Sequence, residues 1–313
     1  MEGIMVDGVF ILCPMLPEHF ATLDRSIVLK KIIKCVMLAK NLGAGVATLG
    51  GFTSIFSDQG INVASRRILP VTTGNTLTAA LVLKSVLKAV DVLGYDLSQL
   101  TVGVVGAAGD IGSACARALT PLCKKIIFVS REQNKIQKFA STLQESHKVC
   151  IYADVENVAK EADVLITATS SITTLISEQA LKAGAIVCDV SLPPNIARGL
   201  IRQRNDVLVF EGGYANLPFF DNIKNLEFKK HFRHGAVFGC LAEGIILAME
   251  KRFENFSLGR GGITLEKMKE INTLAEKHGF TVAPFFCSDK KYTENDFMII
   301  RNHYMARKDQ HAN

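Results

Sequence analysis

The sequence predicts an α/β fold: a doubly wound parallel (Rossmann) sheet with a second α/β lobe formed by the N-terminal part and the C-terminal helices. The first indication is a glycine-rich turn between a β-branched run and a helical pattern, within Thr101–Arg117. The second is the regular alternation of short apolar runs and helical patterns up to about residue 210, which is typical of a parallel sheet. The third is the pair of long apolar helical patterns that flank this region, Thr76–Leu93 and Phe238–Phe253.

Composition sets broad limits on the function. The 313 residues suffice for two domains, and 48% hydrophobic with 21% charged residues is ordinary for a globular enzyme. A net charge of +6 is too mild to indicate nucleic-acid binding. Acidic Glu2 and Asp7 argue against a signal peptide, and no apolar run reaches the ~18 residues of a membrane span. The eight cysteines form no Cys-x-x-Cys pair, so we expect no metal site, no disulfide framework and a cytoplasmic location.

Before the glycine-rich turn, the patterns predict a strand, a helix, a buried strand, two further glycine turns and a long helix. These are Val9–Cys13, Leu23–Leu42, Ala44–Leu49, Gly50–Ser54, Thr72–Asn75 and Thr76–Leu93. With the strand that leads into the turn and those that follow it, six strands are expected, the full count for a dinucleotide-binding domain. They are Val102–Val105, Lys125–Ser130, Val149–Ala153, Val164–Thr169, Ala185–Val190 and Val207–Phe210.

The C-terminal part is predicted to be helical. Helical patterns cover Phe238–Phe253 and Thr264–His278, and the charged tail from Ser288 is expected to be loosely held. The predicted domains are therefore 98–215 for the nucleotide, and 1–97 with 216–313 for the second lobe, which carries the substrate chemistry.

The glycine turn predicts nucleotide binding. Gly106 permits the turn, Gly109 lets the backbone approach a pyrophosphate, and Gly112 lets the helix pack close to the strand. The anion would face the N–H groups of the helix start. The remaining cofactor-binding candidates are Ala107, Ala108, Asp110 and Ile111 in the turn, with Thr169 and Ser170 after the fourth strand at the nicotinamide edge. An αβ connection with incidental glycines is the alternative.

The end of the second strand favours NADP(H). It reads Phe128-Val129-Ser130-Arg131, without the carboxylate that selects NAD. Arg131 offers a bidentate fork for a 2′-phosphate, and Ser130 offers a hydroxyl. If Arg131 is only an exposed arginine at a helix start, the preference stays open.

Cys240 is the candidate nucleophile. It lies near the start of an apolar helix, two histidines and an arginine precede it, and Glu243 follows one turn later. A helix N-terminus and nearby cations would lower the thiol pKa. From the residues alone, a buried core cysteine is the favoured interpretation, because apolar helices often contain one.

Several motifs resemble the long-chain fatty acyl-[acyl-carrier-protein] reductases, which supply fatty aldehydes. The motifs are Leu49–Ile55, Thr72–Thr76, Val105–Ser113 and Asn255–Arg260. The similarity runs from about residue 8 to 283, and several of these motifs fall outside the generic nucleotide fold. The resemblance implies that Cys240, in the Phe238-x-Cys240-x-x-Glu243 pattern, takes the acyl group as a thioester that NADPH reduces to the aldehyde. Relative to that family, the chain lacks an N-terminal segment and adds residues from about 285 to 313, so the donor could be acyl-carrier protein or acyl-CoA.

This chemistry needs hydrogen-bond donors for the carbonyl oxygen and a proton donor. The turns at Gly50-Gly51 and Thr73-Gly74-Asn75 are candidate donors, His234 is the candidate acid, and Glu243 could orient the thiol or neutralise the basic residues before the helix. Two other functions stay open: a shikimate-dehydrogenase-like oxidoreductase of a small hydroxy acid, and a non-catalytic NADPH-binding protein.

Overall fold

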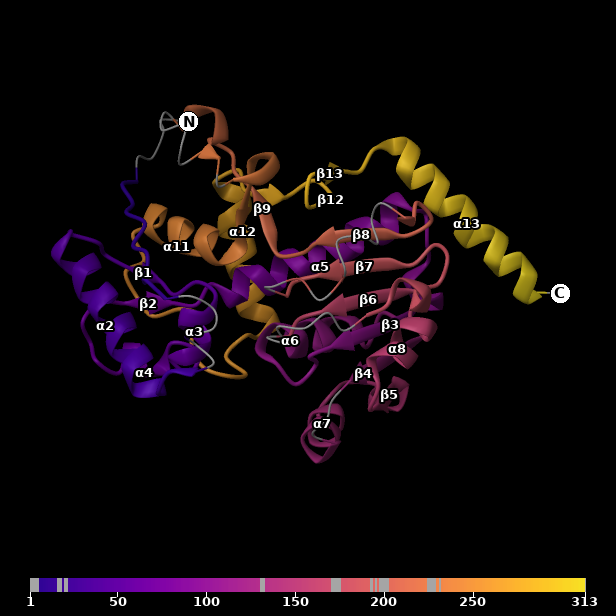
Figure 1. The fold of residues 1–313 in the computed structure, drawn as a ribbon, viewed down its shortest axis with the longest axis horizontal. Helices are drawn as coiled ribbons and strands as arrows, with labels where there is room; N and C mark the ends of the chain where they lie inside the picture. The colour runs from indigo at the N-terminus through magenta and orange to yellow at the C-terminus, as the bar shows by residue number, and fades with distance from the viewer. Residues whose placement is uncertain are drawn as a thin grey trace.

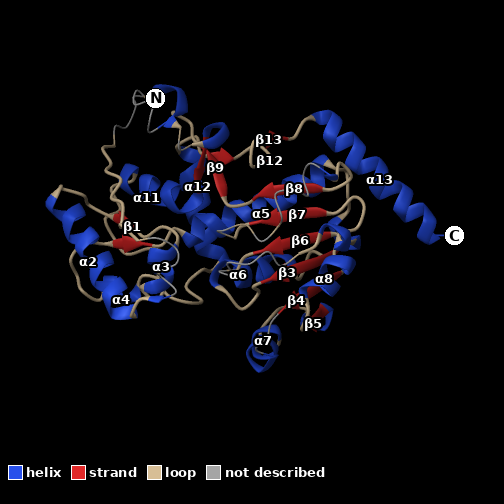
Figure 2. Ribbon diagram, in the orientation of Figure 1, coloured by secondary structure: helices blue, strands red, loops and turns tan. Residues whose placement is uncertain are grey.

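The computed structural model describes residues 6–15, 19, 22–129, 133–169, 176–191, 194, 196, 203–223, 229–230 and 232–312. At its centre lies a six-stranded sheet in the order β5-β4-β3-β6-β7-β8, with every neighbouring pair parallel (Figure 2). The strands are β3 (Thr101–Val105), β4 (Lys125–Val129), β5 (Val149–Tyr152), β6 (Val164–Thr167), β7 (Ile186–Asp189) and β8 (Leu208–Glu211). This is the strand order of dinucleotide-binding domains, so the predicted fold class is confirmed.

Both faces of the sheet are covered by helices. The helices are α5 (Asn75–Val92), α6 (Asp110–Leu119), α7 (Gln133–Ala140) and α8 (Val155–Glu161). Val104 of β3 packs into the core shared with α5, α6 and α7, whereas Val105 packs on the opposite face with α8. Burial on both faces explains why these strands are almost continuously apolar in the sequence.

A small lobe precedes the sheet and lies at one end of the molecule (Figure 1). It consists of α2 (Arg25–Asn41), β1 (Ala47–Thr48), α3 (Phe52–Phe56), α4 (Ile61–Ala64) and β2 (Val71–Thr72), with β1 and β2 paired in parallel. The predicted strand at Val9–Cys13 is wrong, because residues 6–15 form neither a strand nor a helix. Instead, Ile11, Cys13 and Met15 pack against the buried face of α2.

A third group of elements packs on the free side of α5. It contains β9 (Tyr214–Asn216), β10 (Ala236–Phe238), α11 (Gly239–Met249), α12 (Leu265–Lys277) and β11 (Thr281–Val282). The three strands form an antiparallel sheet in the order β10-β9-β11, and their apolar core includes Leu77 and Leu81 of α5. Helix α5 therefore joins the nucleotide-type sheet to the lobe that carries Cys240.

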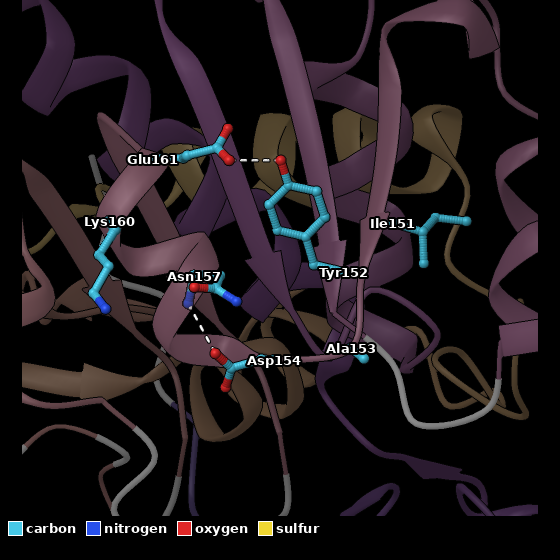
Figure 3. Close-up of a pocket in the computed structure, with 7 residues that line it drawn as sticks. All are labelled: Ile151, Tyr152, Ala153, Asp154, Asn157, Lys160 and Glu161. Atoms are coloured by element: carbon cyan, nitrogen blue, oxygen red, sulfur yellow. Dashed lines mark hydrogen bonds between the residues drawn. The ribbon is translucent and has the colours of Figure 1, made fainter.

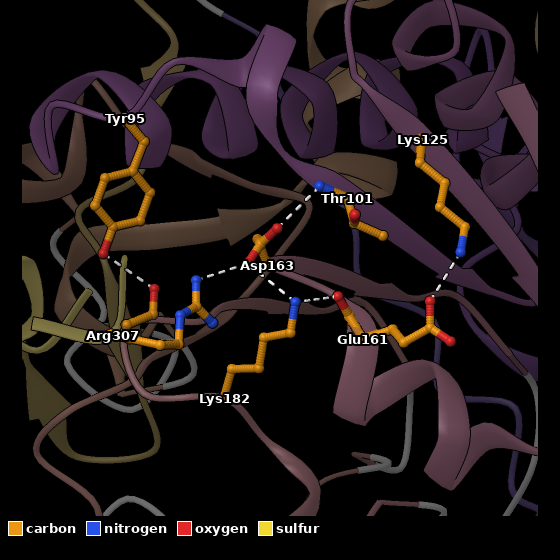
Figure 4. A network of polar contacts seen from close by, with 8 residues as sticks. Tyr95, Thr101, Lys125, Glu161, Asp163, Lys182 and Arg307 are labelled. Atoms are coloured by element: carbon orange, nitrogen blue, oxygen red, sulfur yellow. Dashed lines mark hydrogen bonds and ion pairs between the residues drawn. The ribbon is translucent and has the colours of Figure 1, made fainter. Parts of the chain in front are cut away.

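The tail is not loosely held, and that prediction is wrong. It forms β12 (Phe286–Cys287), β13 (Lys290–Lys291) and the long α13 (Glu294–Ala312). Arg307 of this helix pairs with Asp163 at 2.7 Å, and Figure 4 shows the two side chains facing each other. The Tyr95 hydroxyl donates to the carbonyl of Gly184. The Tyr304 ring stacks on Tyr95 with 3.8 Å between centroids. Apolar residues spaced along this charged helix pack into the core of the sheet domain. The charged composition of the tail hides this pattern.

None of the helices in the described part of the chain combines the length and apolar character that crossing a membrane requires. In the same part of the chain, no three His, Cys, Asp or Glu side chains are grouped so that they could hold a metal ion.

Candidate functional site

The glycine turn closes the end of β3 against the start of α6. Gly106 has a φ of +89°, and a Cβ there would overlap the carbonyl oxygen of Ala168. A Cβ on Gly112 would overlap the carbonyl oxygen of Gly106, so the helix packs directly on the strand end. The N–H groups of the first helical turn have no partner within the helix. The turn therefore fits the pyrophosphate of a dinucleotide, which needs a tight backbone and free N–H groups.

The Asp110 side chain makes a contact with α5 and not with the pyrophosphate site. Its Oδ2 accepts a hydrogen bond of 3.0 Å from Nδ2 of Asn75, at the start of α5. Burial raises the pKa of Asp110, while Asn75, the Gly261 N–H and the charge of Arg260 oppose this rise. Only the backbone N–H of Asp110 is thus left to face a phosphate, and its carboxylate belongs to a contact between the glycine turn and the loop before α5.

The ends of β6 and β7, where the nicotinamide edge is predicted, are joined by hydrogen bonds around Asp189. The buried Asp189 accepts hydrogen bonds from Thr167 Oγ1 (2.6 Å) and the Ser191 N–H (3.0 Å). The Thr169 N–H in turn donates to Ser191 Oγ at 3.3 Å. Since Ala168 touches Gly106, Thr169 lies beside the glycine turn. Ser130, Arg131 and Ser170, also predicted to contact the cofactor, lie outside the described residues.

Cys240 lies in the first turn of α11, between two glycine turns. A Cβ on Gly74 would lie 2.5 Å from the Cβ of Cys240, and a Cβ on Gly50 would lie 3.9 Å from its sulfur. The two turns that sequence patterns singled out as donor candidates, 50–51 and 73–75, thus both lie beside Cys240, whose side chain is half-buried. The N–H groups of Thr73, Gly74 and Asn75 already donate to the Ser257 carbonyl and to the hydroxyls of Thr72 and Thr73. Small Gly239 is also required, because a side chain there would strike Thr78 and the Gly213 carbonyl.

The thiol pKa differs from the sequence expectation. A lowered pKa was predicted from the helix start and the preceding cations, but burial raises the pKa of Cys240 to about 11. The Glu243 carboxylate adds to the rise, while the N–H groups of Leu241 and Cys240 oppose it. The helix start does favour the thiolate, but desolvation outweighs it, since Gly50 lies beside the sulfur and Gly74 packs on the Cys240 backbone.

Glu243 is fully buried and caps a distant helix. Its Oε1 accepts hydrogen bonds from the hydroxyls of Thr72 and Ser257, the latter at 2.7 Å, and its Oε2 accepts from the Leu77 N–H at 2.8 Å. Burial raises its pKa, and these donors limit the rise. Glu243 therefore fixes the Thr72–Leu77 loop at the start of α5 on the Cys240 helix. A helix cap supplied from 166 residues further along the chain leaves no local sequence signal.

His234 is exposed and contacts the β12–β13 hairpin. Its Nε2 lies 3.3 Å from the Ser288 carbonyl oxygen, its ring packs on Phe286, and its φ is +53°. The structure describes no contact between His234 and Cys240.

Tyr214 is a residue that the sequence reasoning missed. It is the cross-strand partner of Phe238, two residues before Cys240, and the two rings lie 4.6 Å apart. Burial is the largest cause that raises the pKa of Tyr214, and the charge of Glu211 raises it further. The Cys240 thiol is near enough to add to this rise. Glu211 also accepts the Ser288 N–H at 2.9 Å and lies 3.6 Å from Arg233. The Glu211-Gly212-Gly213-Tyr214 turn, interpreted only as the end of the sheet, was the available signal.

A separate hollow of about 560 Å³ lies along the edge strand β5 and helix α8 (Figure 3). Tyr152 donates to Glu161 at 2.5 Å beside it, and Asp154 caps α8. Neither the glycine turn nor the Cys240 loops line this hollow.

Comparisons with known proteins show which families and proteins the chain is similar to. The sequence model of the Shikimate / quinate 5-dehydrogenase family matches residues 88–211. The aminotransferase PigE of a Serratia species is 30% identical over 311 residues, covering 96% of this chain and 35% of PigE. The long-chain acyl-[acyl-carrier-protein] reductase of Synechococcus elongatus is 30% identical over 289 residues, covering 89% of this chain and 83% of that protein. The chain thus spans about a third of the first relative and most of the second.

Solved structures align with parts of the chain. The nucleotide-binding domain of glutamyl-tRNA reductase from Thermoplasma volcanium is 23% identical, with a TM-score of 0.30, and covers 49% of this chain and 93% of that domain. Quinate dehydrogenase from Corynebacterium glutamicum, in complex with NAD, is 20% identical with a TM-score of 0.32, covering 41% of this chain and 50% of that one. On the extent of its match to the Synechococcus enzyme, together with its sheet and glycine turn, the chain belongs to the long-chain acyl-[acyl-carrier-protein] reductase family and is an NAD(P)-dependent oxidoreductase.

Proposed function

We propose that this protein reduces a long-chain acyl thioester to the aldehyde with NADPH, through an acyl-enzyme on Cys240. The acyl donor is an acyl-carrier protein or acyl-CoA. One observation carries the proposal: the loop before α5 touches both halves of the reaction. Gly74 of this loop packs on Cys240, and Asn75, the next residue, is hydrogen-bonded to Asp110 of the glycine turn.

In the first step, Cys240 takes the acyl group. The thiol loses its proton, its sulfur attacks the thioester carbonyl carbon, and the carrier leaves as a thiol after taking up a proton. The N–H groups of Cys240 and Leu241 lie close enough to the sulfur to favour the thiolate. Gly50 lies beside the sulfur, since a Cβ there would be 3.9 Å from it, and Gly74 packs directly on the Cys240 backbone.

In the second step, the bound acyl group is reduced. NADPH supplies the hydride when bound at the glycine turn. The carbonyl carbon of the Cys240 thioester accepts it, and the resulting thiohemiacetal oxygen takes up a proton. The C–S bond then breaks, which releases the aldehyde and restores the thiol. The balance is one acyl thioester, one NADPH and one proton consumed for each aldehyde, carrier thiol and NADP⁺.

Charge develops on the carbonyl oxygen in both steps, so the site needs donors that are fixed in advance. The backbone N–H groups of the 50–51 turn are the candidates, because Gly50 lies beside the Cys240 sulfur. Those of Thr73, Gly74 and Asn75 already donate to the Ser257 carbonyl and to the hydroxyls of Thr72 and Thr73. For the proton, Tyr214 is a better candidate than His234. Its ring belongs to the strand pair that leads into α11, and the Cys240 thiol lies near enough to affect the pKa of its hydroxyl.

A second candidate is the oxidation of a small hydroxy acid, favoured by the family match over residues 88–211. That match covers the sheet domain and stops short of Cys240. The direct test is an assay of NADPH oxidation against acyl-CoA and acyl-carrier thioesters of graded length, with the aldehyde measured by gas chromatography. The proposal expects one aldehyde per NADPH oxidised. NADP⁺ reduction with shikimate or quinate, and no aldehyde from any thioester, would establish the second candidate instead.

A further inference from the structure

We infer that Asn75 is a positioning residue that fixes the glycine turn relative to the acylated Cys240. It does so through a string of hydrogen-bonded side chains, Gln59–Asn75–Asp110. The inference rests on the proposed function and extends it. It assigns a role in hydride transfer to three polar side chains that do not touch the sulfur.

The contacts of the Asn75 amide define the string. Its Nδ2 donates to Oδ2 of Asp110 at 3.0 Å and to Oε1 of Gln59 at 3.2 Å. Asp110 is the first residue of α6, whose N–H groups face the pyrophosphate site, and Gln59 belongs to the small N-terminal lobe. One amide group thus joins the nucleotide domain to the lobe beside it.

The position of Asn75 in the chain connects this string to the cysteine. The preceding residue, Gly74, packs against the backbone of Cys240, and the loop is held on α11 by Glu243. The Thr73 N–H and hydroxyl both bond the Ser257 carbonyl, which restrains the loop from a third side. A displacement of the glycine turn relative to Asn75 therefore changes the distance between the hydride donor and the acyl carbon.

The Gln59 end of the string is built on strained backbone. Asp58, Gln59 and Gly60 have consecutive φ values of 55°, 51° and 82°, all in the left-handed region that non-glycine residues avoid. Backbone of this kind persists where the surroundings impose it, and it is concentrated at functional sites. Here the Gly259 N–H bonds the Gln59 carbonyl at 2.9 Å, which holds the side chain toward Asn75.

Charge provides a way to test the pair. In Asn75→Asp, two carboxylates face each other in a partly desolvated place, so the contact becomes repulsive. In Asp110→Asn the amide oxygen still accepts from Nδ2 of Asn75, so this hydrogen bond keeps its donor and acceptor and loses only the negative charge. The double variant also has one donor and one acceptor, with their positions exchanged. The Gln59 amide can rotate to donate to the new carboxylate.

The experiment separates the two half-reactions in the full-length protein. Each variant is first acylated with a long-chain acyl-CoA in the absence of NADPH, and label on the protein gives the acylation rate. The acyl-enzyme is then mixed rapidly with NADPH, and the single-turnover rate of NADPH oxidation is followed. NADPH affinity is measured separately by fluorescence. Gln99→Ala, which removes an exposed amide whose described contact is with Ser98, is the control.

We expect acylation of Asn75→Asp within about threefold of wild type and its hydride-transfer rate lowered about thirtyfold, the size of effect that a small misplacement produces. The double variant should regain most of that loss, and Asn75→Ala should fall between wild type and Asn75→Asp. Equal losses in both half-reactions, unchanged hydride transfer, or no rescue by the double variant would overturn the inference. If Asn75→Asp does not fold, Asn75→Ala and the double variant decide it. Wild-type protein that never becomes acylated would refute the proposed function instead, and a loss of NADPH affinity rescued by the exchange would then still support the string.

Discussion

Gly74 and Cys240 pack backbone to backbone: a Cβ at position 74 would overlap the Cα and the carbonyl oxygen of Cys240. This contact brings the loop before α5 and the first turn of α11 together around one sulfur atom. It holds only while residue 74 is glycine, because the φ of +72° also disfavours a side chain.

Gly74→Ala is therefore expected to impair acylation. The new methyl group must displace Cys240 or the loop, so the acylation rate should fall by about a hundredfold, the effect of misplacing a reacting group by ~1 Å. Gly43→Ala is the matched control, because Gly43 has a φ of +85° but open space around it. It should lower the free energy of unfolding by about 1 kcal/mol and leave acylation unchanged. Equal acylation by both variants would contradict the packing argument.

The pH dependence of acylation follows from the Cys240 thiol. Burial raises its pKa to about 11, so the reactive thiolate is a minor species at neutral pH. Deprotonation increases with pH up to the pKa, so the acylation rate should rise about tenfold per pH unit between pH ~7 and ~10. The measurement is acyl label on the protein without NADPH, with Cys240→Ser as the background. A rate independent of pH over this range would show that a neighbouring group already holds the thiol deprotonated.

Glu243 is expected to matter for stability before catalysis. Glu243→Ala leaves the donors of Thr72, Ser257 and Leu77 buried without their acceptor. It should lower the free energy of unfolding by about 3 kcal/mol, whereas Glu243→Gln, which keeps an acceptor, should lower it by about 1 kcal/mol. Urea denaturation followed by circular dichroism measures both.

The same carboxylate gives a pH signature. Because burial raises the folded-state pKa of Glu243 above its ordinary value of 4.5, the folded protein holds this proton more tightly than the unfolded chain. The stability that the protonated form contributes is present below pH 4.5 and is lost as pH rises through the folded pKa. The advantage of wild type over Glu243→Gln should therefore shrink with rising pH, and an advantage that grows would contradict a raised pKa.

Arg131 tests the choice of cofactor. Replacing it with alanine should raise the KM for NADPH about tenfold or more and leave the KM for NADH nearly unchanged, because only NADPH carries the 2′-phosphate. Parallel steady-state assays with the two cofactors measure the difference. Equal changes in both values would refute the role assigned to this residue.

The sheet domain was accessible from the sequence, because each of its signals is local. Strands buried on both faces are continuously apolar, and the glycine turn lies between a strand and a helix that adjoin it in sequence. The six strands, the close contact of Gly112 with Gly106 and the helix carrying Cys240 follow from such local patterns.

The rest of the site depends on contacts between distant segments. Glu243 caps α5, Asn75 bonds Asp110, and Tyr214 reaches the Cys240 helix by strand pairing; none of these contacts leaves a spacing to find. The lowered pKa expected for the Cys240 thiol was wrong, because the burial that the apolar helix pattern also indicated outweighs the effect of the helix start. The tail was misjudged because its charged residues outnumber the few apolar ones that dock it.

The most direct test of the account is whether Cys240 carries the acyl group. Protein is incubated with a long-chain acyl-CoA without NADPH, and its intact mass is measured, followed by peptide mapping. We predict one acyl group per chain, on Cys240, that is lost as the aldehyde when NADPH is added. Cys35→Ser, which removes another half-buried cysteine, should behave as wild type. If Cys240→Ser still acquires the acyl group and still forms aldehyde, the assignment of the nucleophile is wrong.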